Sequence, residues 1–337
     1  MHPGIVGALA LASRLVALAG AWGAAALWFK APRRGRAYAW LLGVWLLWCG
    51  AVLSGLWGGR ALTALLAYLA AHALLLGWWR TLLPSNERAW ADDVARTGWA
   101  EVDGDAVRLH EVRNFDWRSR TDYTARWETR RYDLARLATL DLITSHWTYR
   151  SVAHVLLSFG FAGGEQLVFS VEIRRARDQR FSELGGFFKE FELSVVAADE
   201  RDIIRVRTNV RGEDDYLFHV RLPRARMRSL FLAYLAQMNA LAHTPRFYNT
   251  VTVNCTTLVY QMMRHIDGRL PLDYRLLLSG YLPEYLYAVG GLDARYSLAE
   301  LRRFGRITER ARLAEPSADF SRAIRSGIPP LEDAQPG

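Results

Sequence analysis

Three nearly uninterrupted apolar segments, residues 4–29, 38–58 and 61–79, constrain how the first quarter of this chain can fold. Each has about the 20 residues that a helix needs to cross a bilayer. The first segment is too long, and lacks a clear small-residue cleavage site, to be a simple secretory signal. Near the segment ends, where interfacial anchors occur, lie Trp28, Trp40, Trp57, Trp78 and Trp79. We therefore expect residues 1–84 to form a membrane anchor of three transmembrane helices.

The charged residues narrow the choice of partners. The formal net charge is +9, and it comes almost wholly from arginine because Lys30 and Lys189 are the only lysines. An arginine-rich chain with interspersed acidic residues usually has a solvated surface, and attraction to anionic lipid headgroups is the functional alternative. No basic tract with interleaved aromatic residues indicates nucleic-acid binding. The basic loop at 30–36 favours a cytoplasmic side for itself and, after three spans, for residues 85–337. Two cysteines, Cys49 and Cys255, exclude a disulfide framework and a cysteine-rich metal site, and we expect no cofactor.

Residues 85–315 are expected to form one α+β domain, followed by a C-terminal tail at 316–337. An alternating stretch at 100–109 surrounds an Asp-Gly turn, which predicts a hairpin. Strand patterns precede helix patterns, as in an α+β fold. The expected strands are 137–147, 152–161, 166–174, 191–196, 203–207 and 216–222. The expected helices are 182–189, 223–242, the segment from Cys255 to Gly268, and surface helices within 298–325.

Cys255 lies where a helix begins, the position that favours a thiolate nucleophile. After it, Leu258, Val259, Met262, Met263 and Ile266 recur at helical spacing, and Thr252 or Asn254 can cap the start. A helix N-terminus offers unpaired N–H groups and partial positive charge, which lower a thiol's pKa and can hold an oxyanion. The alternative is a structural cysteine buried as a small hydrophobe.

A thiol nucleophile needs a base, and His154 is the strongest candidate. It interrupts the apolar strand 152–161, where a buried imidazole needs a partner. If the turn of the following hairpin is centred on Gly163, paired residue numbers sum to 326, which sets Glu172 opposite His154. A one-residue change in the turn would set Ile173 there instead. The alternative is a core histidine bonded to a backbone carbonyl.

Four strings occur in the order found in one protein family: residues 112–119, 153–161, 199–205 and 248–257. The chain resembles the Lnb periplasmic-domain family, which is named for a bacterial lipoprotein N-acyltransferase. The resemblance covers most of residues 85–315 and implies a circularly permuted papain-like domain of the NlpC/P60 type behind the three transmembrane helices. It implies a Cys–His pair at Cys255 and His154, with Glu172 as the orienting residue. It also implies a periplasmic domain anchored in the bacterial inner membrane. This location differs from the cytoplasmic side that the basic first loop favours.

These features lead to three functional hypotheses. The first is a membrane-anchored acyltransferase that forms an acyl-thioester on Cys255 and acts on membrane lipid or lipoprotein. Its oxyanion would be held by the Cys255 N–H and Asn254, with Thr256 and Tyr248 as positioning residues. The second is a thiol amidase or peptidase acting on cell-wall peptides. The third is a non-catalytic membrane-anchored scaffold.

Overall fold

The structure is a computed structural model that describes residues 2–30, 36–314 and 319–332, with mixed α+β architecture behind three apolar helices. The described chain forms two compact units. One unit contains the N-terminal helices as far as Ser85 together with residues 181–190, and the other contains residues 86–180 and the chain from Phe191 onward. The sequence did not predict that residues 181–190 belong with the N-terminal helices.

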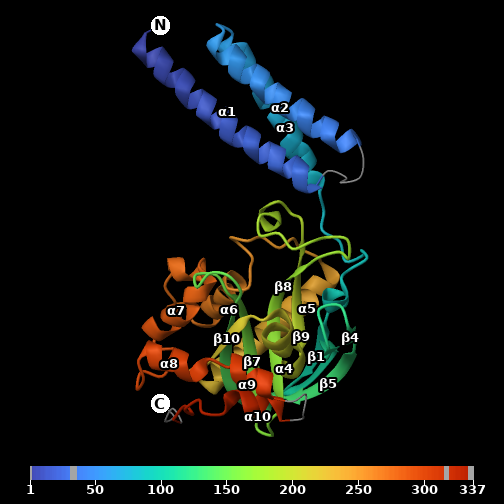
Figure 1. The fold of residues 1–337 in the computed structure, drawn as a ribbon, viewed down its shortest axis with the longest axis vertical. Coiled ribbons are helices and arrows are strands. Elements are labelled where there is room, and N and C mark those ends of the chain that lie inside the picture. Colours follow the sequence, from blue (N-terminus) through green and yellow to red (C-terminus); the bar gives the residue numbers. More distant parts are fainter. Residues whose placement is uncertain (1, 31–35, 315–318, 333–337) are drawn as a thin grey trace. The chain divides into compact units, whose positions relative to one another are not determined.

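The helical unit consists of α1 (Pro3–Lys30), α2 (Arg36–Trp57) and α3 (Ala61–Thr81), which Figure 1 shows lying alongside one another. All three are long and apolar enough to cross a membrane. Small residues allow close packing: the indole of Trp45 donates a hydrogen bond of 2.9 Å to the carbonyl oxygen of Gly20. A Cβ at Gly23 would lie 2.6 Å from the Trp45 ring. Glycine is therefore needed where α1 approaches α2.

The second unit is built on a sheet whose strand order is β1-β2-β9-β8-β7-β6-β10, with β5 also paired to β2. Strands β7 and β8 form an antiparallel hairpin whose paired residues include Leu156 with Ser170 and Gly160 with Gln166. This is the register predicted from a turn at Gly163. The strand bounds are β1 Trp99–Asp103, β2 Ala106–Arg113, β5 Trp127–Asp133, β6 Leu137–His146, β7 His154–Phe161, β8 Gln166–Arg174, β9 Glu192–Ala198 and β10 Asp214–His219; β3 (Asp116–Trp117) and β4 (Tyr123–Thr124) form a separate pair.

Helices cover both faces of the sheet (Figure 1). On one face, α5 (Arg224–His243) and α6 (Thr257–Ile266) pack on alternate strand residues such as Val155 and Phe169. On the other, α4 (Glu200–Ile203), α9 (Thr308–Leu313) and α10 (Phe320–Arg325) pack on residues such as Leu156 and Val168. A π-helix, η4 (Val206–Arg211), follows α4. Helices α7 (Leu282–Ala288) and α8 (Leu298–Gly305) and the short 3-10 turns η1 Asp92–Val94, η2 Leu134–Arg136, η3 Gly185–Phe187, η5 Tyr274–Leu276 and η6 Ser279–Tyr281 complete the described elements.

Two local expectations were wrong. Residues 203–207 are helical rather than a strand, because Asp199 caps α4 by accepting the Arg201 N–H at 3.0 Å. Burial of Ile203 and Ile204 against the sheet then outweighs their β propensity. The helix expected at 182–189 is only the 3-10 turn η3 (Gly185–Phe187), because Gly185 and Gly186 disfavour a longer helix. By contrast, α10 lies within the region 298–325 where surface helices were expected.

Candidate functional site

The turn before α6 places Cys255 at a helix N-terminus. Asn249 and Val253 exchange backbone hydrogen bonds of 3.1 and 3.0 Å, which close the turn. Asn254 Oδ1 then accepts the N–H groups of Thr256 at 2.9 Å and Thr257 at 2.8 Å. The capping role expected of Thr252 or Asn254 thus belongs to Asn254, which satisfies donors that the helix start leaves unpaired.

Helix α6 holds the thiol against the core. Leu258, Tyr260 and Met262 are buried along it, and the Tyr260 hydroxyl donates to the Leu270 carbonyl oxygen at 3.1 Å. Cys255 itself is buried, with 8% of its surface exposed. The sulfur is therefore held on an element that cannot shift without disturbing the packed face of the sheet.

His154 begins β7 and meets the thiol of Cys255. Burial alone would raise the pKa of Cys255, but the hydrogen bond and charge of His154, together with the N–H of Val155, lower it below its usual value. Burial alone would lower the pKa of His154, but the Glu172 carboxylate and the bond to Cys255 raise it to about 9. These opposite shifts favour a thiolate–imidazolium pair at neutral pH.

Glu172 and Ser170 contact the other side of the imidazole. His154 Nε2 lies 3.2 Å from Glu172 Oε1 and 2.7 Å from Ser170 Oγ, and the Ser170 hydroxyl donates to Glu172 Oε1 at 2.7 Å. Because Nε2 is engaged here, Nδ1 is the ring nitrogen left to face the thiol. The structure thus brings Cys255, His154 and Glu172 together, as the sequence predicted; their catalytic role stays a prediction.

Arg207 completes the surroundings of the carboxylate. Its guanidinium donates to Glu172 Oε1 at 2.9 Å and to the Ile203 carbonyl oxygen at 2.8 Å. Burial would raise the pKa of Glu172, but the charges of His154 and Arg207 hold it well below its usual value. Glu172 is therefore ionised and shared between an imidazole and a guanidinium. Arg207 was not among the predicted site residues, because the helical turn that presents it was predicted as the strand 203–207.

The three expected positioning residues lie in different settings. The amide of Asn254 donates to the Thr250 carbonyl oxygen at 2.7 Å, so this side chain shapes the turn in which Cys255 lies. Thr256 gives its N–H to Asn254 and has its hydroxyl 3.9 Å from the Cys255 sulfur. Tyr248 is partly buried close to Cys255 and Glu172, and burial followed by the charge of Cys255 raises its pKa. Tyr234 of α5, expected only as core, is also near enough for the Cys255 charge to raise its pKa after burial does.

A buried acidic cluster adjoins the site through β6. Ser145 pairs with His154 across the two strands, and its hydroxyl lies 2.5 Å from both Glu213 Oε2 and Asp215 Oδ1. One hydroxyl hydrogen serves one of these carboxylates, so the other contact requires a proton on a carboxyl group. Burial raises the pKa of Asp215 to about 7, so Asp215 is the carboxyl group that carries this proton. Sequence spacing contained no signal for this cluster, because it joins β6 to the start of β10, which are far apart in the sequence.

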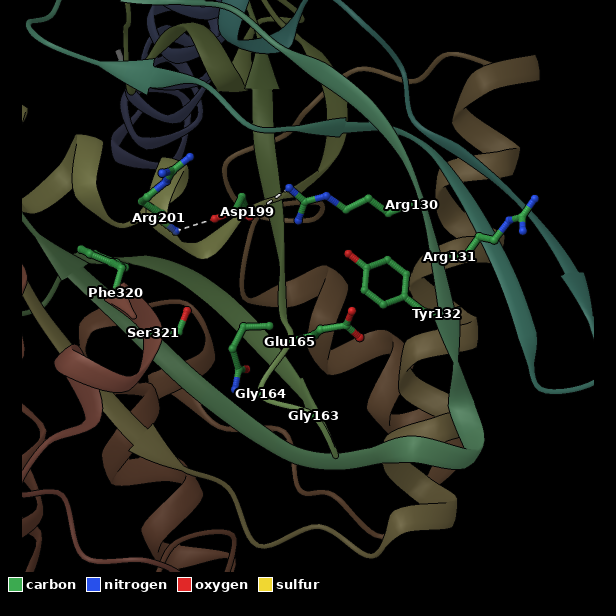
Figure 2. A pocket seen from close by; sticks show the side chains of 11 residues that line it. Arg130, Arg131, Tyr132, Gly163, Gly164, Glu165, Asp199, Arg201, Phe320 and Ser321 are labelled. Carbon is green, nitrogen blue, oxygen red and sulfur yellow. Dashed lines mark hydrogen bonds and ion pairs between the residues drawn. The ribbon is translucent and has the colours of Figure 1, made fainter. Parts of the chain in front are cut away.

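Two of the cavities that the described residues line differ in their distance from His154 along the strands. One, of about 840 Å³, is lined by residues 146–150, which follow β6, and by side chains of α8. The other, of about 610 Å³, adjoins Gly163 and Gly164 at the far end of the β7–β8 hairpin (Figure 2). At about 3.3 Å per residue, this second cavity is separated from His154 by most of the length of β7. Its Arg130 pairs with Asp199 at 2.9 Å, so its charges are mixed.

No group of three or more His, Cys, Asp or Glu residues suited to a metal ion occurs in the part of the chain that the structure describes. An ionised thiol, a base and an orienting carboxylate are the parts of a nucleophilic acyl-transfer site.

Residues 123–280, which include Cys255, His154 and Glu172, match a family model described as the Lnb N-terminal periplasmic domain. This is the family that the sequence motifs indicated. No protein with a curated description and no solved structure matches the chain. The periplasmic description and the three apolar helices fit a membrane protein with a periplasmic domain.

Proposed function

We propose that this chain, whose residues 123–280 match the family model of the Lnb N-terminal periplasmic domain, is a membrane-anchored thiol acyltransferase of the bacterial inner membrane. The contact of the Cys255 thiol with His154, whose Nε2 lies 3.2 Å from Glu172 Oε1, is the observation that carries the proposal. A circularly permuted papain-like fold is part of this proposal, with histidine preceding cysteine in the chain.

In the first step, the Cys255 thiolate attacks the carbonyl carbon of a lipid acyl ester. A sulfur–carbon bond forms, the carbonyl oxygen becomes an oxyanion, and the ester carbon–oxygen bond then breaks. The imidazolium of His154 gives its proton to the departing alkoxide, which leaves as an alcohol. The product is an acyl-thioester on Cys255 and a neutral imidazole, held in orientation by Glu172.

In the second step, an amine attacks the thioester carbonyl carbon. His154 takes the amine proton, the carbon–sulfur bond breaks, and the thiolate–imidazolium pair is restored with an amide as product. A lipoprotein's amino-terminal cysteine is an acceptor with this chemistry. If water attacks instead, the same residues release a free acid.

The oxyanion needs donors close to the sulfur. Among the described residues, no acceptor takes the Cys255 N–H, so this group is free to bond an oxyanion. We propose the Tyr248 hydroxyl as the second donor, because it lies near Cys255 while the Asn254 amide donates to Thr250. Losing one such donor typically costs about 3 kcal/mol of transition-state stabilisation.

A lipid substrate suits both the anchor and the cavity beside β6. Confinement to a membrane raises the effective concentration of a lipid for an enzyme anchored in the same bilayer. The 840 Å³ cavity is lined by aromatic residues, Trp147 and Tyr149, and by arginines that include Arg150 and Arg303. Aromatic surface with guanidinium groups is the chemistry that recognises a phosphate-bearing amphiphile.

The test uses the full-length protein in vesicles of phospholipid with isotope-labelled acyl chains, with a diacylglyceryl peptide as acceptor. We expect a hydroxylamine-sensitive acyl adduct on wild type and on Cys49→Ser, and none on Cys255→Ser. Labelled amide should appear on the acceptor peptide. Equal labelling of wild type and Cys255→Ser would support a scaffold, and cleavage of cell-wall peptides without any lipid adduct would support the amidase.

A further inference from the structure

Residues 181–190, between β8 and β9, have the sequence Phe-Ser-Glu-Leu-Gly-Gly-Phe-Phe-Lys-Glu and pack with the membrane helices rather than with the sheet. The ring of Phe188 stacks on that of Phe29 near the end of α1, with centroids 5.3 Å apart and planes within 10°. Lys189 Nζ donates to the Trp79 carbonyl oxygen at 2.8 Å and lies 5.0 Å from the Trp79 ring centroid. A lysine there satisfies a carbonyl group at the C-terminal end of α3.

The same segment exposes large apolar side chains. Phe181 is 60% exposed, Leu184 63% and Phe187 41%. Three such side chains in ten residues make a contiguous apolar surface of the kind that marks an interaction site. Phe188 and Lys189 attach the segment to the ends of α1 and α3. The exposed side chains of the segment therefore continue the apolar surface of helices that are long and apolar enough to cross a membrane.

Part of the backbone of the segment is hydrogen-bonded within the segment. The N–H of Gly185 bonds to Ser182 Oγ at 3.0 Å, that of Phe187 to the Leu184 carbonyl oxygen at 3.0 Å, and that of Glu190 to the Gly185 carbonyl oxygen at 3.1 Å. Each such bond lowers the cost of bringing the turn to the edge of an apolar phase, where unpaired backbone groups are disfavoured. Glu183 and Lys189 add charge, which suits the boundary between headgroups and acyl chains rather than the bilayer centre.

We infer that residues 181–190 are an interfacial loop whose Phe181, Leu184 and Phe187 insert into the phospholipid bilayer that surrounds α1–α3. The tryptophans at the same helix ends, Trp28 and Trp79, are of the type that anchors a protein at this depth. The loop is thus a fourth membrane contact, made by a segment inserted between two strands of the periplasmic domain. This inference concerns membrane contact and does not depend on acyl transfer.

The experiment places the photocrosslinker benzoylphenylalanine at Leu184, at Phe187 or at Leu313 of the full-length protein in phospholipid vesicles. Leu313 is the matched control because it is an exposed leucine, 83% accessible, in a helix of the other unit. After illumination, we expect phospholipid adducts at positions 184 and 187 at several times the yield at 313. The replaced side chains are all exposed, so the variants should fold. Two positions in the loop are tested so that the result does not depend on one of them alone.

Three outcomes would overturn the inference: adduct yields at 184 and 187 no greater than at 313, adducts to water only, or adducts to a polypeptide when native membranes replace vesicles. A Cys255→Ser background should give the same lipid adducts, because no acyl transfer is needed. Failure of this experiment would leave the acyl-adduct test untouched, and the reverse also holds.

Discussion

Replacing Glu172 by glutamine should collapse the thiolate–imidazolium pair while preserving the size of the side chain. The carboxylate lies 3.2 Å from His154 Nε2, and two unit charges at that separation interact by about 5 kcal/mol at an effective dielectric constant of about 20. The rise in the pKa of His154 from 6.5 to about 9 corresponds to about 3 kcal/mol. The attraction between Glu172 and the imidazolium is therefore larger than the free energy that corresponds to the rise in pKa. Its loss should return the pKa of His154 to its ordinary value or lower.

Arg207 makes the effect larger. Without Glu172, its guanidinium remains beside the imidazole as an unpaired positive charge and further disfavours the imidazolium. A fall in the pKa of His154 from about 9 to 6.5 lowers the ratio of charged to neutral Cys–His pairs by about 300-fold. The acidic limb of the pH profile for Cys255 alkylation should then move upward by about two pH units.

The assay is iodoacetamide alkylation of Cys255 followed by mass spectrometry between pH 4 and 10, in a Cys49→Ser background so that one thiol is present. Glu165→Gln is the matched control, because Glu165 is an exposed glutamate at the far end of the same hairpin. We expect the control profile to superimpose on wild type. A superimposable profile for Glu172→Gln would refute the reasoning that this carboxylate sustains the ion pair.

Three further predictions concern the surroundings of the site. Asp202→Ala should cost about 3–5 kcal/mol of stability in thermal unfolding, because it leaves buried Arg113 without the carboxylate that it binds at 2.8 and 3.1 Å. Gly280→Ala should slow formation of the acyl adduct, because a Cβ there would collide with the Arg150 carbonyl oxygen in the loop that leads to His154. Asp215 should contribute stability that is lost as pH rises from about 4 to about 7, because the folded state binds this proton more tightly than an exposed aspartate does. In pH-resolved melting curves, wild type should therefore lose stability relative to Asp215→Asn over this range.

Each of these predictions has a counterpart on the same chain. Asp122→Ala breaks an exposed arginine pair that solvent screens, and it should leave the melting temperature nearly unchanged. Gly268→Ala places its Cβ in open space and should leave adduct formation unchanged. If Asp202→Ala and Asp122→Ala melt alike, or if Gly268→Ala slows the adduct as much as Gly280→Ala, the structural arguments fail. For Asp215→Asn, a curve with the wild-type pH dependence would contradict the proton assignment.

The pairing of Glu172 with His154 was predictable because it depends on short-range geometry, whereas the pairing of Cys255 with His154 was implied by the family resemblance. The Gly163 turn sets the strand register, and strand side chains alternate, so Glu172 falls beside His154. The position of Cys255 at a helix start follows from Asn254 and the helical spacing after it. Regular periodicity also predicted the three apolar helices and the main strands of the sheet.

The rest required tertiary information. Ile203 and Ile204 have strand-forming side chains, but the Asp199 cap and their burial select a helix, and this places Arg207 on Glu172. Strand β5 was missed because its sequence, Trp127 to Asp133, is charged and only partly buried, without clear alternation. The association of residues 181–190 with α1 and α3 depends on single contacts, such as that of Lys189, which no periodicity encodes.

His154 and Cys255 lie on elements of unequal rigidity. His154 belongs to β7 and Glu172 to β8. Both strands are hydrogen-bonded on both sides, because β7 lies between β6 and β8, and β8 lies between β7 and β9. Cys255 follows a turn closed by a few local bonds around Asn249. Local opening should therefore begin at the turn, where amide hydrogens exchange fastest, while the sheet stays protected. On warming, the sulfur should part from its base before the domain melts, so that loss of thiol reactivity precedes global unfolding.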